Sequence, residues 1–226
     1  QSGSTWASMR LSPQLCTAHR PGTRDTQRSH QLLWLWRHQR LTDLQSVGLN
    51  GPVSSGPEFW INGQAGSALS LPDRGHEFGD GLFETLLLTS GVPQFPGYHE
   101  RRLHLGFERL RFAGPAPALL ALVSPALDRA AELPLAALRL TLSRAPGARG
   151  YEPGNDPGHR SVLRLTALDG DVSERAAPAS LGVSSIALAS QPALAGIKHL
   201  NRLEQVLAAA ERQHMGVDEV VTCDLS

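Results

Sequence analysis

The alternation of hydrophobic and polar residues from residue 58 onward predicts a series of short elements. An apolar run at residues 59–61, followed by Asn62 and Gly63, predicts a β-hairpin whose second strand lies near residues 68–71. Three glycines in the next stretch allow tight turns, and the apolar run 82–88 behind it predicts a longer strand that ends in a hairpin.

Two helices and several more strands follow along the chain. Leu103, Phe107 and Leu110 recur at helical spacing and predict an amphipathic helix over residues 98–111, and residues 118–133 predict a second helix. Strands are expected at four places: 137–143, 161–168, 180–189 and 218–224. These elements predict an α+β (α/β two-domain) fold.

The predicted elements divide into a small domain over residues 58–143 and the start of a larger β-rich domain over residues 144–226. The chain has 226 residues, of which 41% are hydrophobic, which is enough for one large or two small cores. Its formal net charge is zero, so it lacks the basic footprint of a nucleic-acid or membrane-surface protein. No apolar run approaches a membrane span, and Cys16 and Cys223 do not form a disulfide framework. We therefore expect a cytoplasmic protein without a metal site.

Residues 1–52 differ from the rest, because they show no sustained period and crowd polar residues around a Trp-rich patch at 32–36. A disordered extension or a partner anchor would explain them. We prefer another hypothesis. Residues 31–44, back-translated and read one base later, can give Asn-Ser-Phe-Gly-Phe-Gly-Gly-Thr-Asn, which resembles the C-terminal signature of a β-ketoacyl-acyl-carrier-protein synthase. We expect residues 1–52 to be an out-of-frame translation of such a neighbouring gene, and sequencing the natural N-terminus tests this.

Lys198 is the only lysine in the chain, beside twenty arginines. A guanidinium stays charged, whereas a lysine amine with a lowered pKa can form a Schiff base or carry protons. The plain alternative is a leftover surface lysine. The apolar positions that follow recur at helical spacing and predict that Lys198 lies in a turn just ahead of a packed helix: Leu200, Leu203, Val206, Leu207 and Ala210.

The segment 196–207, Gly-Ile-Lys-His-Leu-Asn-Arg-Leu-Glu-Gln-Val-Leu, resembles the Schiff-base segment of the aminodeoxychorismate lyases, which are class IV (fold type IV) pyridoxal-phosphate enzymes. The resemblance implies that Lys198 binds pyridoxal 5'-phosphate. It also implies a homodimer that converts 4-amino-4-deoxychorismate to 4-aminobenzoate and pyruvate in folate biosynthesis. Residues 73–85 resemble a second signature of the family, whose loop forms part of the substrate-side wall and of the dimer contact.

Further site residues follow from the same resemblance. The family's His-x-x-Arg-Leu pattern falls on residues 99–103, which implies that Arg102 binds the cofactor phosphate and makes His99 a candidate substrate contact. Residues 143–151 resemble a Ser-Arg-Gly segment of the family, although Ala145 and Pro146 depart from it, and make Arg149 and Tyr151 candidates for binding a carboxylated substrate. A solvated helix face and a solvated loop are the plain alternatives.

Two rival functions stay open on the sequence. A D-amino-acid or branched-chain aminotransferase uses the same lysine, and a non-catalytic fragment would share the scaffold. The family's later segment, which holds a glutamate opposite the pyridine nitrogen and completes the phosphate cup, has no counterpart before Ser226. We therefore expect the chain to be truncated at its C-terminus, inactive by itself and prone to aggregation.

Overall fold

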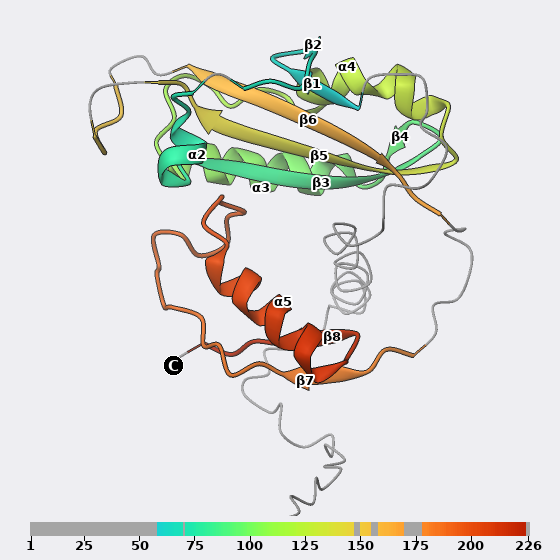
Figure 1. The fold of residues 1–226 in the computed structure, drawn as a ribbon. Coiled ribbons are helices and arrows are strands. Elements are labelled where there is room, and N and C mark those ends of the chain that lie inside the picture. Colours follow the sequence, from blue (N-terminus) through green and yellow to red (C-terminus); the bar gives the residue numbers. More distant parts are fainter. Residues whose placement is uncertain (1–57, 70, 147–149, 155–157, 170–177, 225–226) are drawn as a thin grey trace, which may run out of the picture. The chain divides into compact units, whose positions relative to one another are not determined.

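The computed structural model describes residues 58–69, 71–146, 150–154, 158–169 and 178–224 (Figure 1). The hypothesis for residues 1–52 lies outside this part of the chain. Six strands form one antiparallel sheet in the order β2-β1-β6-β5-β3-β4. They are β1 (Phe59–Ile61), β2 (Gln64–Ala65), β3 (Gly81–Thr89), β4 (Val92–Pro93), β5 (Leu135–Arg144) and β6 (His159–Ala167).

The sheet corrects the expected end of the first domain. We placed that end at residue 143, but β6 pairs with β5 along its whole length and with β1 on its other side. The strand after the Pro/Gly-rich loop therefore belongs to the same sheet as the strand before it. A hydrophobic pattern identifies strands but not their partners, which is why the pattern could not locate this boundary.

Both tight hairpins follow from residues with left-handed backbone conformations. Asn62 and Gly63 have φ of 49° and 80°, and Ser90 and Gly91 have φ of 46° and 77°, as two-residue hairpin turns require. The first turn also shows that the strand predicted at residues 68–71 is wrong. A two-residue turn places the partner strand immediately after it, so β2 begins at Gln64.

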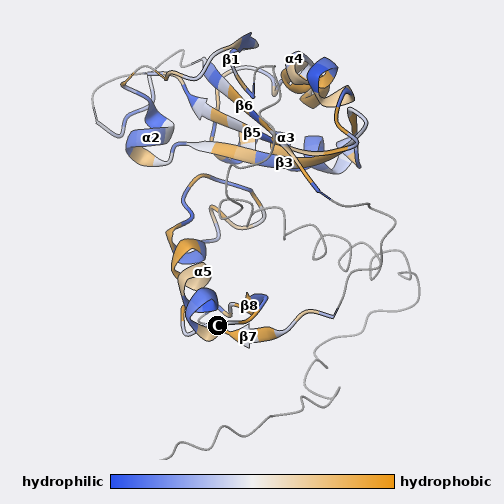
Figure 2. Ribbon diagram, turned by 45° about the vertical axis from the view of Figure 1, so that its right-hand side comes forward, coloured by the Kyte–Doolittle hydropathy of each residue, from blue (hydrophilic) through white to orange (hydrophobic). Residues whose placement is uncertain are grey.

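Helices cover the face of the sheet that carries the core. The helices before β6 are α2 (Arg74–Phe78), α3 (Pro96–Arg109) and α4 (Leu119–Ala131), and the last two confirm the predicted helices to within two residues. Alternate residues of the central strands form one buried cluster with residues of α3 and α4. Figure 2 colours these strands and helices by hydropathy. The large, fully buried side chains of the cluster include Leu86, Leu88, Leu138, Leu140, Leu142, Leu103, Leu119 and Val123. The alternation of the sequence therefore predicted this face of the sheet correctly.

The last part of the chain forms a smaller unit of β7 (Leu181–Val183), α5 (Leu203–Met215) and β8 (Glu219–Val221), with β7 and β8 parallel. The expected strands at 180–189 and 218–224 are too long, since each has three residues of regular pairing. The packed helix is also wrong: Leu203, Val206 and Leu207 are 77%, 59% and 54% exposed, and only Ala208 of α5 is buried. Glu211 of α5 accepts hydrogen bonds from the turn after β7, and nothing among the described residues covers the leucine side formed by Leu203, Val206 and Leu207.

Candidate active site

The backbone around Lys198 is attached to the first residues of β3. The Phe83 N–H donates to the Lys198 carbonyl (2.8 Å), and the Leu200 N–H donates to the Gly81 carbonyl (3.0 Å). Between these bonds Leu82 and His199 form an antiparallel bridge. The segment before α5 therefore extends the sheet beside β3, and alternation places the side chains of Lys198 and Phe83 on the same side of this pairing.

Glycines make room for this segment. A Cβ on Gly79 would lie 2.1 Å from the Asn201 Oδ1. On Gly81 it would lie 2.2 Å from the Leu142 carbonyl oxygen and 2.7 Å from the Leu200 Cδ1. We expected these glycines only to permit tight turns, and Gly79 does have a left-handed φ of 66°. The structure adds close approach of the 198–201 segment as a second reason for them.

The amine of Lys198 lies among positive groups over one aromatic ring. Its Nζ is 4.8 Å from the centre of the Phe83 ring, and the guanidinium carbons of Arg139 and Arg202 lie 4.1 and 5.3 Å from the same centre. Each distance is within the range of a cation–π contact. Three cationic side chains therefore lie around one ring. Their mutual repulsion disfavours the charged form of Lys198.

Burial is the main reason that the pKa of Lys198 falls to about 8. The carboxylate of Glu84 acts in the opposite direction, and Arg102, Arg202 and Arg139 lower the pKa further. About a tenth of the amine is then neutral at pH 7, against about three in ten thousand for an ordinary lysine. A neutral amine is the form that attacks a carbonyl carbon, so this lysine is prepared for Schiff-base chemistry.

Arg102 and His99 are not the solvated residues of the plain alternative, because both bind the carboxylate of Glu84. Arg102 donates from Nε and Nη2 to the two oxygens at 2.6 Å each, and His99 Nδ1 lies 2.8 Å from one of them. The Glu84 side chain is 1% exposed. Burial raises its pKa, but hydrogen bonds from Arg102 and His99 outweigh burial, and the pKa lies below its ordinary value. Arg102 therefore has a fixed orientation.

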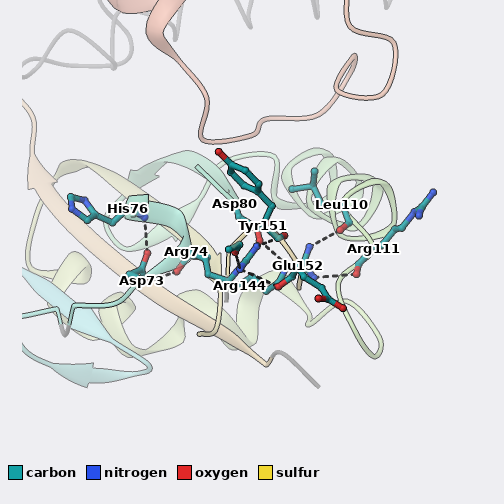
Figure 3. A network of polar contacts seen from close by, with 11 residues as sticks. Asp73, Arg74, His76, Asp80, Leu110, Arg111, Arg144, Tyr151 and Glu152 are labelled. Atoms are coloured by element: carbon teal, nitrogen blue, oxygen red, sulfur yellow. Dashed lines mark hydrogen bonds and ion pairs between the residues drawn. The ribbon is translucent and has the colours of Figure 1, made fainter. Parts of the chain in front are cut away.

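A second polar network fastens the loop that carries Tyr151 (Figure 3). Arg74 donates to the carbonyl oxygens of Gly150, Tyr151 and Glu152 at 3.0, 2.9 and 3.3 Å, and its Nε donates to Asp80 at 2.9 Å. Tyr151 itself is 85% exposed, and the centre of its ring lies 5.3 Å from that of Phe78. Asp80 also precedes Gly81, so one short stretch anchors both this loop and the Lys198 segment.

The same network reaches the end of α3. Arg144 donates to Asp80 at 2.9 Å and to the carbonyl oxygens of Leu110 and Arg111 at 2.6 and 3.1 Å. This arginine belongs to the Ser-Arg segment that we compared with the family, and its contacts are structural. Arg149 of that segment lies outside the described residues.

In the structure Arg102 is one of the charges that lower the pKa of Lys198, His99 is held on Glu84, and Tyr151 lies exposed on a fastened loop. The residues that sequence reasoning missed are Phe83, Glu84, Arg139 and Arg202. One signal was present in the sequence: Arg139 is a charged residue between two leucines of a predicted strand. Arg102 and Glu84 are eighteen residues apart and only the packing of α3 on β3 joins them.

The donor set fits a phosphorylated aldehyde. A primary amine with a lowered pKa suits the aldehyde, and the guanidinium groups of Arg102, Arg139 and Arg202 suit an anion. Two buried polar atoms, Thr85 Oγ1 and His199 Nδ1, have no hydrogen-bond partner in the described part of the chain. Among the described residues no group of three or more His, Cys, Asp or Glu could hold a metal ion, and no helix is long and apolar enough to cross a membrane.

Residues 81–226 match the family described as amino-transferase class IV, and the chain belongs to that family. Its mixed α+β fold is that of the fold type IV pyridoxal-phosphate enzymes. An aminodeoxychorismate lyase of Vibrio harveyi is 30% identical over 168 residues, which are 74% of this chain and 61% of that protein. The chain thus spans less than two thirds of the length of this relative.

Two solved structures extend the comparison. The 4-amino-4-deoxychorismate lyase from Pseudomonas aeruginosa matches with a TM-score of 0.63 at 36% identity, covering 74% of this chain and 61% of that one. A branched-chain amino acid aminotransferase from Escherichia coli matches with a TM-score of 0.60 at 18% identity, covering 74% of this chain and 58% of that one. The second likeness concerns the fold alone.

Proposed function

We propose that this protein is a pyridoxal-phosphate-dependent lyase that converts 4-amino-4-deoxychorismate to 4-aminobenzoate and pyruvate. The observation that carries the proposal is the amine of Lys198, the only lysine of the chain, with a pKa of about 8 and guanidinium groups around it. The 30% and 36% identities to two aminodeoxychorismate lyases support the lyase over the aminotransferases of the same fold.

Pyridoxal phosphate, when bound, supplies an aldehyde attached to an electron-accepting ring. Lys198 would hold the cofactor through this aldehyde, and its lowered pKa keeps part of the amine neutral for that purpose. With substrate bound, Lys198 Nζ would be the base that takes the proton from the substrate carbon bearing the nitrogen. A pKa near 8 suits an amine that accepts and returns protons near neutral pH.

Arg102 binds the phosphate in this proposal. Two of its five N–H groups are used by Glu84, which leaves three for an anion. Arg139 and Arg202 add positive charge over the Phe83 ring. Arg149 and Tyr151 orient the carboxylates of the substrate, and the Arg74 contacts to the Tyr151 segment support the Tyr151 part of this assignment.

The proposal is tested by incubating the protein with pyridoxal phosphate and 4-amino-4-deoxychorismate and measuring 4-aminobenzoate and pyruvate. Parallel reactions contain a D-amino acid or a branched-chain amino acid with 2-oxoglutarate. We expect both lyase products in equal amounts and none from Lys198→Arg, which keeps the positive charge but not the reactive amine. Amino-group transfer without 4-aminobenzoate would assign the protein to the aminotransferases instead.

A further inference from the structure

Two arginines stand side by side on the face of the sheet opposite to the α3–α4 cluster. In the pairing of β5 with β6, Arg139 lies directly opposite Arg164, so both side chains are on one face. Directly opposed residues have Cβ atoms about 5 Å apart, and like charges in such a pair destabilise a sheet. The pair therefore costs stability unless a negative group lies between the two guanidinium groups.

The sheet itself does not supply that negative group. Glu84 is the only acidic residue in β1, β3, β5 and β6, and it lies on the other face, where α3 binds it. Asp73, near one end of the arginine face, is already hydrogen-bonded to β5 and β6. Neither Arg139 nor Arg164 forms an ion pair with any residue that the structure describes.

A buried hydroxyl beside the pair also lacks a partner. Thr85 is the residue of β3 directly opposite Arg139, on the same face of the sheet. Its Oγ1 is buried without a hydrogen-bond partner in the described part of the chain. Buried polar atoms in native proteins are nearly always hydrogen-bonded, so this one calls for a ligand. Three hydrogen-bond donors thus form one row across the strands: Thr85, Arg139 and Arg164.

This row lies within reach of the Lys198 amine. The guanidinium carbon of Arg139 is 4.1 Å from the centre of the Phe83 ring, and Lys198 Nζ is 4.8 Å from the same centre. The sum of these distances, about 9 Å, is the largest separation that the two groups can have. In 4-amino-4-deoxychorismate the ring carboxylate lies across the six-membered ring from the amine, about 6 Å away by ordinary bond lengths. A hydrogen bond of about 3 Å spans the rest.

We propose that Arg139 and Arg164 form a two-arginine clamp for the ring carboxylate of the substrate, with the Thr85 hydroxyl as a third donor. The inference rests on the proposed function and deepens it, because it names the residues that select a carboxylated ring. The enolpyruvyl carboxylate is left to Arg149 and Tyr151. A branched-chain amino acid has its single carboxylate beside the amine and presents no anion at this distance, so the clamp favours the lyase substrate.

Binding of two stable probes tests the clamp without turnover. Chorismate has a hydroxyl group where the substrate has its amine, so it keeps both carboxylates but forms no Schiff base. 4-Aminobenzoate keeps only the ring carboxylate. Isothermal titration calorimetry of the full chain should show binding of both probes, with and without pyridoxal phosphate. Arg164→Gln should weaken both by about tenfold or more, as expected for one lost charge-assisted contact, and should leave the affinity for pyridoxal phosphate unchanged.

Two further variants serve as controls. Arg164→Lys keeps the charge and should bind both probes more tightly than Arg164→Gln does. Arg101→Gln removes an exposed cation of α3 and should change neither affinity. Equal binding by Arg164→Gln and the unsubstituted protein, or no binding by the latter, would overturn the proposal. A loss confined to chorismate, a loss of cofactor affinity or an equal loss in Arg101→Gln would also overturn it, since each assigns the effect to another group.

Urea unfolding without ligand gives an independent measurement. Arg164→Gln removes one of two opposed positive charges, so its unfolding midpoint should be higher than that of the unsubstituted protein. Arg101→Gln should leave the midpoint unchanged. A lower midpoint in Arg164→Gln would show that the arginine stabilises the fold, which contradicts a site held open for an anion. Absence of lyase activity, with these binding and unfolding results intact, would reject the proposed function alone.

Discussion

At the residue scale, the site depends on an amine in surroundings that disfavour its charge. The pKa of Lys198 is about 8 in the folded protein against 10.5 ordinarily, so between these values the unfolded chain binds more protons than the folded one. Stability attributable to this group therefore rises with pH from about 8 to about 10.5. Below pH 8 the folded protein bears the full cost of the charged amine.

Lys198→Met should accordingly stabilise the protein at pH 7, by up to about 3 kcal/mol for a shift of this size. Methionine keeps the length of the side chain without the charge. The gain should shrink as pH rises toward 10.5, and urea unfolding at pH 7 and pH 10 measures it. Arg101→Met, which removes an exposed cation of α3, should change the free energy of unfolding by less than about 0.5 kcal/mol at either pH. A Lys198→Met protein that is less stable than the original at pH 7 would contradict the lowered pKa.

The sequence could predict the important lysine but not the charges that act on it. Lys198 stands out because it is unique among arginines, a property of composition alone. The Glu84–Arg102 pair depends on the packing of α3 against β3, and hydrophobic spacing contains no information about which polar residues of two elements will meet. Arg102 was therefore predicted as a phosphate ligand, and its bidentate partner was missed.

At the element scale, the start of β3 is where the segments of the site are joined. The glycine at its first residue allows the Lys198 segment to approach, as the short Cβ distances at Gly81 show. The sequence predicted this strand and both hairpins because their turn residues require left-handed backbone conformations. The sequence pattern predicted the start of β2 several residues too late and predicted β7 and β8 to be longer than they are. These strands are short, and their ends are set by strand pairing rather than by composition.

Gly81→Ala should destabilise the protein by about 1–3 kcal/mol, because the added methyl group overlaps the Leu142 carbonyl and the Leu200 side chain. Gly97→Ala is the control: its Cβ would meet nothing within 4 Å, and alanine is the better helix former at this position of α3. Its free energy of unfolding should stay unchanged or rise by up to about 1 kcal/mol. Urea unfolding compares the two, and similar small effects at both glycines would show that the close approach is not needed.

At the scale of the whole described chain, long-range polar contacts hold the residues around Tyr151, for which a solvated loop was the plain alternative. Arg74 binds three successive carbonyl oxygens more than seventy residues away, and Asp80 links it to Arg144. Composition correctly indicates a loop here. The position of residues 150–152 at the end of that loop depends on hydrogen bonds from the buried Arg74. The uncovered leucine side of α5 was missed for a related reason, since helical spacing predicts an apolar face without predicting what lies on it.

Arg74→Lys should release the residues around Tyr151, because an ammonium group cannot donate to three carbonyl oxygens and Asp80 in the planar arrangement of a guanidinium. Chymotrypsin cleaves after exposed aromatic residues, and we expect cleavage after Tyr151 to be at least about tenfold faster in the variant, since opening the loop no longer breaks charge-assisted hydrogen bonds. Arg109→Lys, an exposed arginine that also binds carbonyl oxygens, is the control and should leave this cleavage unchanged. An unaltered cleavage rate in Arg74→Lys would mean that other contacts hold the loop.

The central claim is that the amine of Lys198 carries pyridoxal phosphate. The most direct measurement is reduction of the protein with borohydride after incubation with the cofactor, followed by mass analysis of the peptides. Because Lys198 is the only lysine, the account predicts one modified side chain, in the peptide that contains it, and none in Lys198→Arg. Modification confined to the N-terminal amine, or none at saturating cofactor, would contradict the account.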